Sequence, residues 1–469
     1  MRRNEFGRGG ALLATFSLSA ALMLAAGSAD AGIFSWLGGK NQNQDQGTYQ
    51  DQGTYQPSPP ARGGGWFGGG RANRQQLAPA QPGSRALGGN SLPPLEGTPA
   101  TREWITNPPL GVPTLASANI AATKAAIAHY QAIVAQGGWP MVPEYAMRPG
   151  SRGREVEILK RRLELSGDLV GQSVPNEYDA ATTEAVRKFQ RRHGIPPTGV
   201  IDRNTIDALN KPATVRLRQL QANLKRLQTL APQTGGRYVL VNIPAAQVEA
   251  VEAGQVVSRH AAVVGKLERP TPEITSKVQE INFNPYWNVP KTIVVKDLVP
   301  KGREMAQRGQ DMLAAYHMQA FTPQGQPVDP RAIDWFGDAV YTYSFRQLPW
   351  EENSLGFVKI NFPNKDAVYL HDTPLKSLFG RSIRFESSGC VRVHNVEGLV
   401  TWILRDNPGW TLDRVLAMKQ TGEQADVKLT KPVPIYLAYV SAWATPDGTV
   451  HFRPDIYGHD GSAETASAY

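Results

Sequence analysis

Apolar residues recur with a helical period on both sides of a compact central stretch. Residues 115–136 are rich in alanine and stop at two glycines and a proline, and residues 213–230 carry apolar side chains mostly three or four positions apart. Both patterns predict helices. We expect these helices to form a scaffold, made of residues 101–146 and 211–235, that holds residues 147–210 between its two parts.

Residues 147–210 predict a small bundle of three short helices joined by tight turns. Asp179 and Asp202 begin the second and third helices, where an aspartate side chain can accept hydrogen bonds from backbone amides that no helical carbonyl reaches. The apolar positions of the bundle are Val156, Leu159, Leu163, Ala185, Val186, Phe189, Ile206 and Leu209. Their spacing favours three helices that share one small core.

From residue 236 to about 460 the period shortens, and β-branched and aromatic residues gather in runs bounded by turn residues. The expected strands are residues 238–243, 256–264, 278–283, 339–343 and 368–370, and the clearest helix is 396–404, which Asn395 would cap. The predicted fold class is therefore α+β. A mostly-β domain at 236–460 is joined to the three-helix bundle on its helical scaffold.

A long polar stretch interrupts the predicted β domain at about residues 297–350. It includes Met305, Met312 and Met318 among many polar residues. Loops of this length in compact domains are usually functional or lack fixed structure. We expect a lid over a site in the β domain.

The first 31 residues have the pattern of a secretory signal peptide. Basic residues precede an apolar run at 11–26, and small residues around Ala31 form a cleavage site. The run is shorter than the roughly 20 residues that span a bilayer, which favours cleavage over a retained anchor. We therefore expect export to the periplasm.

Residues 32–100 predict a disordered tether. The segment repeats the sequence DQGTYQ in tandem and is then rich in glycine, proline and glutamine. Such composition cannot bury enough apolar surface to offset chain entropy. The tether would connect the exported N-terminus to the folded part of the chain.

The net charge of +9 suits an acidic polymer as partner. Export argues against nucleic acid and favours the carboxylate-rich cell wall. The chain has one cysteine, Cys390, and in an exported protein a lone cysteine is an inert apolar residue, an intermolecular bridge or a reactive thiol. Its surroundings favour the reactive thiol.

Cys390 and His371 are the candidate catalytic pair. They stand in two motifs, YLHDTP at 369–374 and SSGCVRV at 387–393. A thiolate is the attacking form of cysteine, and an imidazole can take its proton and later return it to a leaving amine. The fold must bring the two residues together. Gly389 would let substrate approach the backbone, and amides near Cys390 could stabilise an oxyanion.

These motifs resemble the L,D-transpeptidase catalytic domain, which pairs an upstream histidine with the pattern S/T-x-G-C-x-R. Many members have histidine where this chain has Ser388, and the departure matches a large subgroup with the pattern HDTP…SSGCVRV, an inserted peptidoglycan-binding domain and a lid. The three-helix bundle resembles that peptidoglycan-binding domain through residues such as Gly150, Phe189 and Gly199. Altogether the resemblance covers about residues 100–460.

The resemblance implies a two-step acyl transfer without metal or cofactor. The enzyme would release D-alanine from a tetrapeptide stem of peptidoglycan, hold the remainder as a thioester and pass it to a second stem in a 3→3 crosslink. Carbapenems should acylate the same thiol. The implied catalytic groups are Cys390 as nucleophile, His371 as base, the backbone carbonyl of Asp372, the backbone of Gly389, and Tyr369.

Arg392 and Ser388 are candidates for binding substrate. Arg392 could instead hold the cysteine turn by an ion pair, and Tyr369 could be an ordinary core aromatic residue. The remaining histidines are scattered without the spacing of metal ligands, so we expect no metal site.

Several functions remain open within these limits. Water in place of the acceptor amine would make the enzyme an L,D-carboxypeptidase, and an outer-membrane protein could be the acceptor. A non-catalytic wall-binding anchor belongs to another class. Serine enzymes with Ser-x-x-Lys and zinc peptidases with H-E-x-x-H are disfavoured, because neither motif occurs in the sequence.

Overall fold

The computed structural model describes residues 99–144 and 147–461. The predicted signal peptide at 1–31 and the predicted tether up to residue 98 lie outside the described residues. Helix α1 (Pro99–Thr106) already begins within the last two residues of the predicted tether. None of the helices in the described ranges is long and apolar enough to cross a membrane.

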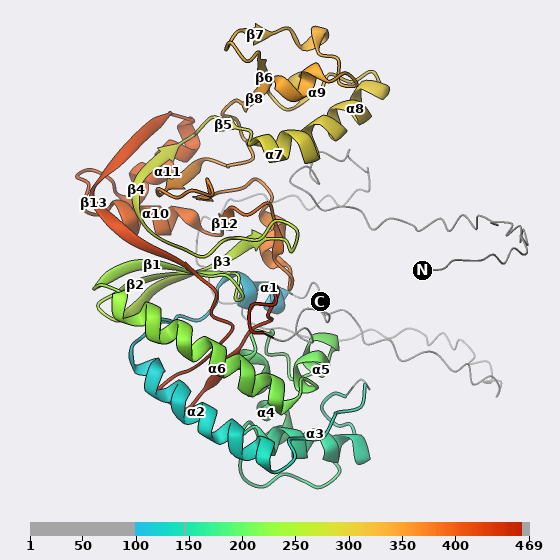
Figure 1. Cartoon of the computed structure of the whole chain (residues 1–469). Coiled ribbons are helices and arrows are strands. Elements are labelled where there is room, and N and C mark those ends of the chain that lie inside the picture. The colour runs from blue at the N-terminus through green and yellow to red at the C-terminus, as the bar shows by residue number, and fades with distance from the viewer. Residues whose placement is uncertain (1–98, 145–146, 462–469) are drawn as a thin grey trace, which may run out of the picture.

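The described chain is built in three tiers (Figure 1). An inserted unit lies at one end, the β domain lies in the middle, and the helical scaffold with the three-helix bundle lies at the other end. This order separates the inserted unit from the bundle and gives the β domain contacts with both.

A nine-stranded sheet forms the β domain, in the order β11-β3-β12-β10-β9-β4-β13-β1-β2. An additional pairing between β2 and β3 joins the end of this order back to the sheet. The strands are β1 (Arg237–Asn242), β2 (Gln247–Glu252), β3 (Gln255–Gly265), β4 (Ile274–Phe283), β9 (Val358–Asn361), β10 (Leu370–His371), β11 (Phe385–Ser387), β12 (Val391–Val393) and β13 (Ala425–Ala438).

Two helices complete the core of this sheet, α10 (Val396–Leu404) and α11 (Leu412–Thr421). Valine and isoleucine from the strands pack against the apolar face of α10, and burial of that surface stabilises the fold. Asn395 stands directly before α10, at the N-cap position, but it adopts a left-handed conformation (φ 47°) and its side chain does not cap the helix. The prediction for Asn395 was wrong in that respect. A 3-10 turn, η6 (Lys376–Gly380), follows β10.

The chain between β4 and β9 folds into a unit with its own core and its own four-stranded sheet, in the order β5-β8-β6-β7. Its core runs from Trp287 to Leu355, so the unit is wider than the lid expected at about 297–350. Its elements are β5 (Trp287–Asn288), α7 (Lys291–Ile293), the π-helical turn η3 (Val294–Leu298), α8 (Val299–Gln307), α9 (Met312–Ala315), β6 (Met318–Phe321), β7 (Pro327–Val328), η4 (Pro330–Ala332), η5 (Ala339–Thr342) and β8 (Ser344–Gln347).

One predicted strand of this region was wrong. Residues 339–343 were expected as a strand, whereas η5 is a 3-10 turn and the strand β8 starts at Ser344. The strand starts where its neighbours begin to pair with it. β8 pairs with both β5 and β6, and these pairings begin only after the 3-10 turn. Local β propensity does not reveal where such a ladder starts.

The scaffold consists of α2 (Ala118–Ala135) and α6 (Ala213–Leu230), which pack together, followed by the short turn η2 (Ala231–Gln233). The C-terminal hairpin of β14 (Ala442–Ala444) and β15 (Val450–Phe452) lies against both helices. Thr123 Oγ1 of α2 accepts a hydrogen bond from the Ala444 amide at 3.0 Å. The end of the β domain is therefore fastened to the scaffold.

The bundle contains α3 (Arg154–Leu165), α4 (Ala180–Arg192) and α5 (Arg203–Leu209) around its own apolar core. The predicted caps are confirmed, because Asp179 and Asp202 accept hydrogen bonds from the third amide of α4 and of α5. The Arg192 guanidinium pairs with buried Asp168, with 2.7 Å between Nε and Oδ1, and also donates to the Val450 carbonyl. This arginine links the bundle to the C-terminal hairpin.

Candidate active site

The pairing of β10 with β12 brings the two sequence motifs together. The strands run parallel, with Leu370 opposite Val391 and His371 opposite Arg392. Leu370 and Val391 belong to the apolar core. Because side chains alternate between the faces of a strand, their neighbours point to the opposite face. The residues on that face are Tyr369, His371, Cys390 and Arg392.

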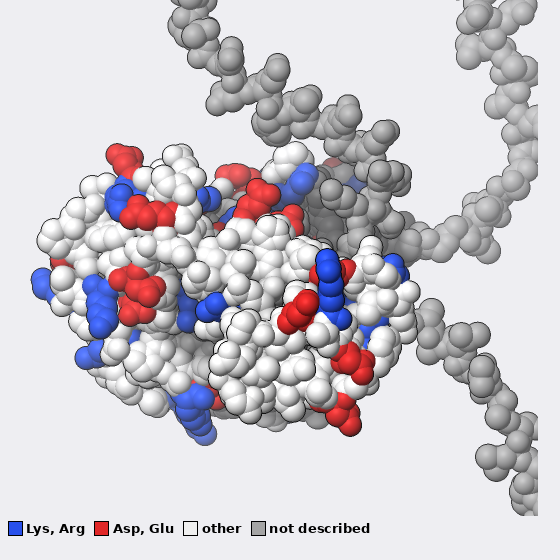
Figure 2. Space-filling model, turned by 90° about the horizontal axis from the view of Figure 1, so that it is seen from above, with Lys and Arg blue, Asp and Glu red and all other residues white. Residues whose placement is uncertain are grey.

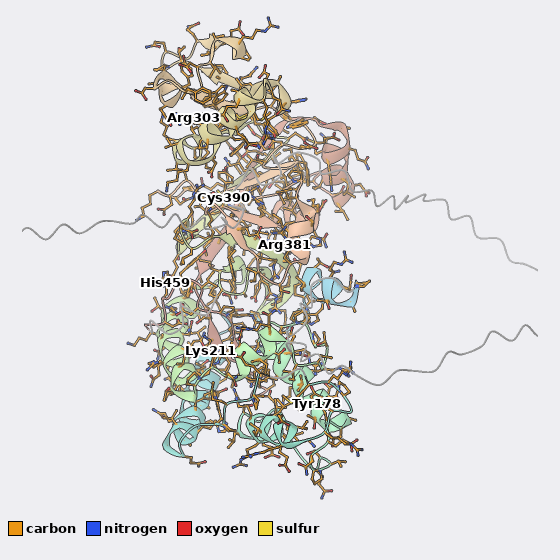
Figure 3. The ribbon with its side chains drawn as sticks, turned by 90° about the vertical axis from the view of Figure 1, so that its right-hand side faces the viewer. Tyr178, Lys211, Arg303, Arg381, Cys390 and His459 are labelled. Carbon is orange, nitrogen blue, oxygen red and sulfur yellow. The ribbon has the colours of Figure 1, made fainter. Side chains whose placement is uncertain are left out.

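These four side chains line one pocket, which also includes residues of the inserted unit. Trp287, Ile293 and Leu355 form that part of the wall. In Figure 3, Cys390 lies between Arg303 of the inserted unit and Arg381 of the β domain. The inserted unit, which contains the segment expected to be a lid, therefore forms part of the pocket wall.

Cys390 is partly exposed to this pocket and forms no disulfide. Burial raises the pKa of its thiol above the usual value, while hydrogen bonds with Tyr369 and the positive charges of Lys359 and Arg392 act in the opposite direction. Burial has the largest effect. The resting thiol is therefore protonated, and a base must take its proton when it attacks.

His371 is buried and its imidazole is neutral at physiological pH. Burial, together with the positive charge of Arg392, lowers the pKa of His371 to about 3. A neutral imidazole can accept a proton, which a protonated one cannot. The site thus holds a neutral thiol and a neutral base.

Asp372 was predicted to orient the histidine through its backbone carbonyl. The Asp372 backbone acts on the ring and raises the pKa of His371, although less than burial lowers it. The Nδ1 atom is buried and forms no hydrogen bond of acceptable geometry with any described residue. The Asp372 carboxylate pairs with Lys376 and accepts a hydrogen bond from the Phe357 amide at 3.3 Å. The orienting role of the carbonyl stays a prediction.

Lys359 is a site residue that sequence reasoning missed. It stands opposite His371 in the antiparallel pairing of β9 with β10, and its Nζ lies 4.4 Å from the centre of the Tyr369 ring. Burial lowers the pKa of Lys359, and Cys390 acts in the opposite direction when it is a thiolate. No sequence motif includes this lysine. It reaches the site only through the pairing of β9 with β10.

Tyr369 forms the floor of the site rather than a part of the domain core. Its ring contacts His371 edge-on, with 5.7 Å between the ring centres. Burial raises the pKa of its hydroxyl well above the usual value, so the group stays protonated and can donate a hydrogen bond. This arrangement fits the predicted part in aligning the ring or holding an oxyanion.

The turn before Cys390 depends on glycine. Gly389 has φ +111°, where a side chain would be strained, and a Cβ there would approach the Pro270 carbonyl at 3.4 Å. The Gly389 amide donates to Ser387 Oγ at 3.2 Å, whereas the Cys390 amide has no acceptor among the described contacts. A free amide beside the nucleophile can serve an oxyanion.

Arg269 joins this turn to the inserted unit. Its guanidinium pairs with Asp297 of η3, with 3.0 Å between Nη2 and Oδ1, and donates to Ser388 Oγ at 2.8 Å. Ser388 lines the pocket, but its hydroxyl already accepts this bond. Movement of the inserted unit would therefore pull on the turn that carries Cys390.

Thr271 and Tyr457 hold the turn from the side of the scaffold. The Thr271 hydroxyl donates to the Gly389 carbonyl at 2.8 Å, and the Thr271 amide donates to the Tyr457 hydroxyl at 3.1 Å. The Tyr457 hydroxyl in turn donates to the Gly265 carbonyl at 2.6 Å. The C-terminal segment thus reaches the turn that precedes Cys390.

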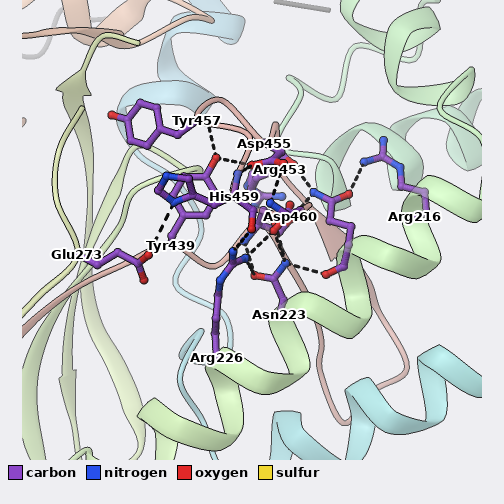
Figure 4. A network of polar contacts seen from close by, with 12 residues as sticks. Arg216, Asn223, Arg226, Glu273, Tyr439, Arg453, Asp455, Tyr457, His459 and Asp460 are labelled. Atoms are coloured by element: carbon purple, nitrogen blue, oxygen red, sulfur yellow. Dashed lines mark hydrogen bonds and ion pairs between the residues drawn. The ribbon is translucent and has the colours of Figure 1, made fainter. Parts of the chain in front are cut away.

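The same segment is anchored on α6 by the polar network of Figure 4. Arg226 of α6 pairs with buried Asp460, with 2.5 Å between Nη1 and Oδ1. The Tyr439 hydroxyl donates to Asp455 at 2.7 Å and accepts from the Tyr457 amide at 2.8 Å. A continuous set of contacts therefore connects the scaffold helix with the cysteine turn.

Arg392 carries a buried charge at the site. No carboxylate among the described residues lies within 4 Å of its guanidinium, and its Nε has no hydrogen-bond partner there. Burial lowers the pKa of Arg392 to about 10. Glu386 acts on the Arg392 charge from a distance and is itself paired with Arg381. Arg392 therefore stays a candidate for binding a substrate carboxylate.

The described residues hold no group of histidine, cysteine and acidic side chains suited to a metal ion. Seen from above the inserted unit, acidic and basic side chains are interspersed over the surface in Figure 2. The field over this face therefore has no single sign. The pocket at Cys390 brings together a thiol, an imidazole and the Arg392 guanidinium.

Comparisons with known proteins cover the β domain and the bundle. Residues 236–435 match the model of the L,D-transpeptidase catalytic domain (YkuD), and residues 152–209 match the "Putative peptidoglycan binding domain". A "Putative L,D-transpeptidase" of Haemophilus influenzae is 35% identical over 246 residues, which are 52% of this chain and 48% of the relative. The chain spans about half the length of this curated relative.

Solved structures of two L,D-transpeptidases are also similar. The protein of Xylanimonas cellulosilytica is 18% identical with a TM-score of 0.20, and the match covers 64% of this chain and 100% of that one. The protein of Stackebrandtia nassauensis is 14% identical with a TM-score of 0.24, covering 64% and 96%. The two matched domains confirm the resemblance found in the sequence, and the α+β class with a mostly-β domain is confirmed as well.

The raised thiol pKa predicts how Cys390 reacts with iodoacetamide. If the resting pair is neutral, the alkylation rate should rise about tenfold per pH unit between pH 6 and 8, as the thiolate fraction does. Cys390 is the only cysteine, so intact mass reports this one group. A rate already level at pH 6 would mean a thiolate–imidazolium pair and contradict this description.

The Arg269–Asp297 pair predicts a loss of stability when one partner is removed. Their side chains are only 14% and 12% exposed, so Arg269→Gln or Asp297→Asn should each lower the free energy of unfolding by about 3 kcal/mol. The double variant should lose less than the sum, as residues in contact do. Urea titration followed by tryptophan fluorescence measures this.

An exposed pair in the same inserted unit is the matched control. Arg308 and Glu304 are 61% and 42% exposed, so Arg308→Gln should change the free energy of unfolding by less than about 1 kcal/mol. Equal losses for Arg269→Gln and Arg308→Gln would show that the Arg269 pair does not fasten the inserted unit.

Proposed function

We propose that the protein forms 3→3 crosslinks between peptidoglycan stem peptides, because residues 236–435 match the L,D-transpeptidase catalytic domain. The reaction passes through a thioester on Cys390 and releases D-alanine. The observation that carries this proposal is the register of β10 and β12, which puts Cys390, His371 and Arg392 on one wall of one pocket.

In the first step, Cys390 attacks the carbonyl between diaminopimelate and the terminal D-alanine of a tetrapeptide. His371 takes the thiol proton as the carbon–sulfur bond forms, and it returns this proton to the nitrogen of D-alanine as the carbon–nitrogen bond breaks. The Cys390 amide, which has no acceptor among the described contacts, and the protonated Tyr369 hydroxyl donate hydrogen bonds to the oxyanion. The product of this step is a thioester and free D-alanine.

In the second step, the side-chain amine of another stem attacks the thioester. His371 takes a proton from this amine, and the same proton returns to the sulfur as the thiol leaves. The new amide is the 3→3 crosslink. Protons and electrons balance within the two stems and the Cys390–His371 pair, so neither step needs a metal or a cofactor.

Arg392 recognises a carboxylate of the donor stem. Support comes from its buried guanidinium, which has no carboxylate partner among the described residues within 4 Å. Ser388 lines the same pocket and contributes through its bond with Arg269. Asp372 orients the histidine through its backbone once the site closes over substrate. Gly389 gives the substrate access to the backbone of the turn.

The protein acts in the periplasm, at the cell wall. Two observations support this location, the match of residues 152–209 to a peptidoglycan-binding domain and the signal-like pattern of residues 1–31. The bundle would keep the catalytic domain near its polymer. Carbapenems are expected to acylate Cys390, because their strained lactam presents an activated amide to the same thiol.

Two other outcomes use the same thioester. Water as acceptor gives an L,D-carboxypeptidase, and an amine of an outer-membrane protein gives a protein attached to the wall. We favour an amine acceptor, because Trp287 and Leu355 of the inserted unit line the pocket with apolar surface that a stem peptide can bury and a water molecule cannot. A wall-binding anchor without activity is the remaining alternative.

The proposal predicts the products formed from purified tetrapeptide muropeptides. The chain lacking residues 1–31 should give 3→3 dimers and free D-alanine, and Cys390→Ala should give neither, which mass spectrometry of the digest shows. His371→Ala should lower the rate by at least about a hundredfold, the usual contribution of a general base.

Arg392→Lys is the matched variant for substrate binding. It keeps the charge but loses the two-pronged geometry of a guanidinium, so the KM for the donor should rise about tenfold. Tripeptide monomers without dimers would instead establish a carboxypeptidase. Unchanged muropeptides would support the anchor.

A further inference from the structure

A second cavity lies between the bundle and the β domain, apart from the pocket at Cys390. It has a volume of about 230 Å³, against about 120 Å³ at Cys390. Residues 194–196 of the bundle, 244–247 and 382–385 of the β domain, and 452–454 of the C-terminal segment form its walls. The cavity therefore sits where the two matched domains meet.

Three arginines line this cavity, Arg216, Arg384 and Arg453. Arg384 is buried and donates to backbone carbonyls, among them Ala262 at 3.1 Å. Arg453 also donates to backbone carbonyls, to Arg192 at 2.9 Å. Neither guanidinium forms a salt bridge within the described ranges. Carbonyl groups satisfy hydrogen bonds but do not neutralise charge.

The acidic groups near the cavity are occupied. Asp207 lines it but pairs with Arg203 at 3.4 Å on the surface of α5. Glu249 acts on Arg453 from a distance and is itself paired with Arg259 at 2.8 Å. Within the described residues, no carboxylate therefore neutralises the charges of Arg384 and Arg453 directly. Burial, with the charges of Arg259 and Arg384 adding to it, lowers the pKa of Arg453 to about 9.

Arg453 presents part of its guanidinium without a bond. Its Nε and Nη2 have no hydrogen-bond partner among the described residues, while Nη1 holds the two carbonyls of Arg192 and Phe452. The Arg453 side chain packs closely on Gly194, where φ is +71° and a Cβ would lie 2.8 Å from Nε, so glycine allows this contact without a shift of the arginine. The free nitrogens form the fork that carboxylates prefer.

Apolar side chains form part of the remaining walls, beside polar ones such as His193, Asn204 and Gln247. Trp104, Ile195 and Phe452 line the cavity, and Ile383 lines it while being 54% exposed, which places Ile383 at the opening. The cavity thus suits a ligand that carries a carboxylate next to apolar groups, as a short peptide does. A bare inorganic anion would leave these walls uncovered.

We infer that this cavity binds a carboxylate of a peptidoglycan stem peptide, as a second substrate-binding site at the junction of the two domains. The choice of peptidoglycan as source rests on the proposed function, whereas the carboxylate rests on Arg384 and Arg453. A stem held here is fixed relative to Cys390, because the same β domain forms both sites. The site would keep the enzyme bound to glycan strands of peptidoglycan that carry further stem peptides.

A charge placed at the opening tests the site without touching the arginines. Ile383→Glu adds a negative charge and Ile383→Gln is its neutral match. Both substitutions are made in the Cys390→Ala chain lacking residues 1–31, so that turnover of the muropeptide does not disturb the binding measurement. Titration calorimetry with a disaccharide-tetrapeptide at low salt should show about five- to tenfold weaker binding for Ile383→Glu than for Ile383→Gln.

The same muropeptide with amidated carboxylates should bind both variants equally. Equal affinities of the two variants for the unmodified muropeptide would overturn the inference. Inorganic phosphate that binds with the same dependence on Ile383, while the muropeptide does not, would also overturn it and identify a phosphate site. Equal thermal midpoints show that both variants fold.

The outcomes separate this inference from the proposed function. With Cys390 and Ile383 both native, release of D-alanine from the soluble muropeptide tests the proposed function by itself, whereas the Ile383 variants report only on binding in the Cys390→Ala chain. If the native chain forms no crosslinks while Ile383→Glu binds the muropeptide more weakly than Ile383→Gln, the transpeptidase proposal fails and the carboxylate site stands. If the native chain forms crosslinks while the two Ile383 variants bind the muropeptide equally, only the carboxylate-site inference fails.

Discussion

The pairing of β10 with β12 is the constraint on which the site depends. The contact is short, with Leu370 opposite Val391 and His371 opposite Arg392. Because the side-chain period of a strand is two, a slip of one residue would turn His371 into the core and Leu370 into the pocket. The apolar core prevents this slip, since both Leu370 and Val391 are fully buried in it. Core packing and catalytic geometry are thus the same arrangement seen from two faces of one sheet.

The cysteine turn receives contacts from both ends of the molecule. Arg269 connects it to Asp297 of the inserted unit, and Thr271 connects it to the segment around Tyr457, which is anchored on α6. Gly389 supplies the backbone conformation that these contacts require. Contacts from the inserted unit, the β domain and the scaffold therefore together hold the turn that carries Cys390. A thiol held in this way keeps its geometry while substrate enters, which a flexible loop would not provide.

Local patterns predicted much of the fold. The bounds of α6 and α10 and the caps at Asp179 and Asp202 follow from helical period and side-chain chemistry. Long-range pairing decided the rest. Residues 339–343 look like a strand but precede the ladder, and Lys359 reaches the site only through its pairing with His371. The motifs identified Cys390 and His371, but the neutral state of the pair comes from burial, which no spacing in the sequence reveals.

In the proposed reaction, the sulfur atom of Cys390 carries the acyl group. The direct test is the intact mass of the protein mixed with a tetrapeptide muropeptide in the absence of an acceptor, quenched with acid. We predict a gain equal to the donor minus D-alanine, located on the peptide that contains Cys390, removed by hydroxylamine and absent in Cys390→Ala. The same gain in Cys390→Ala, or on another residue of the wild-type protein, would contradict the account.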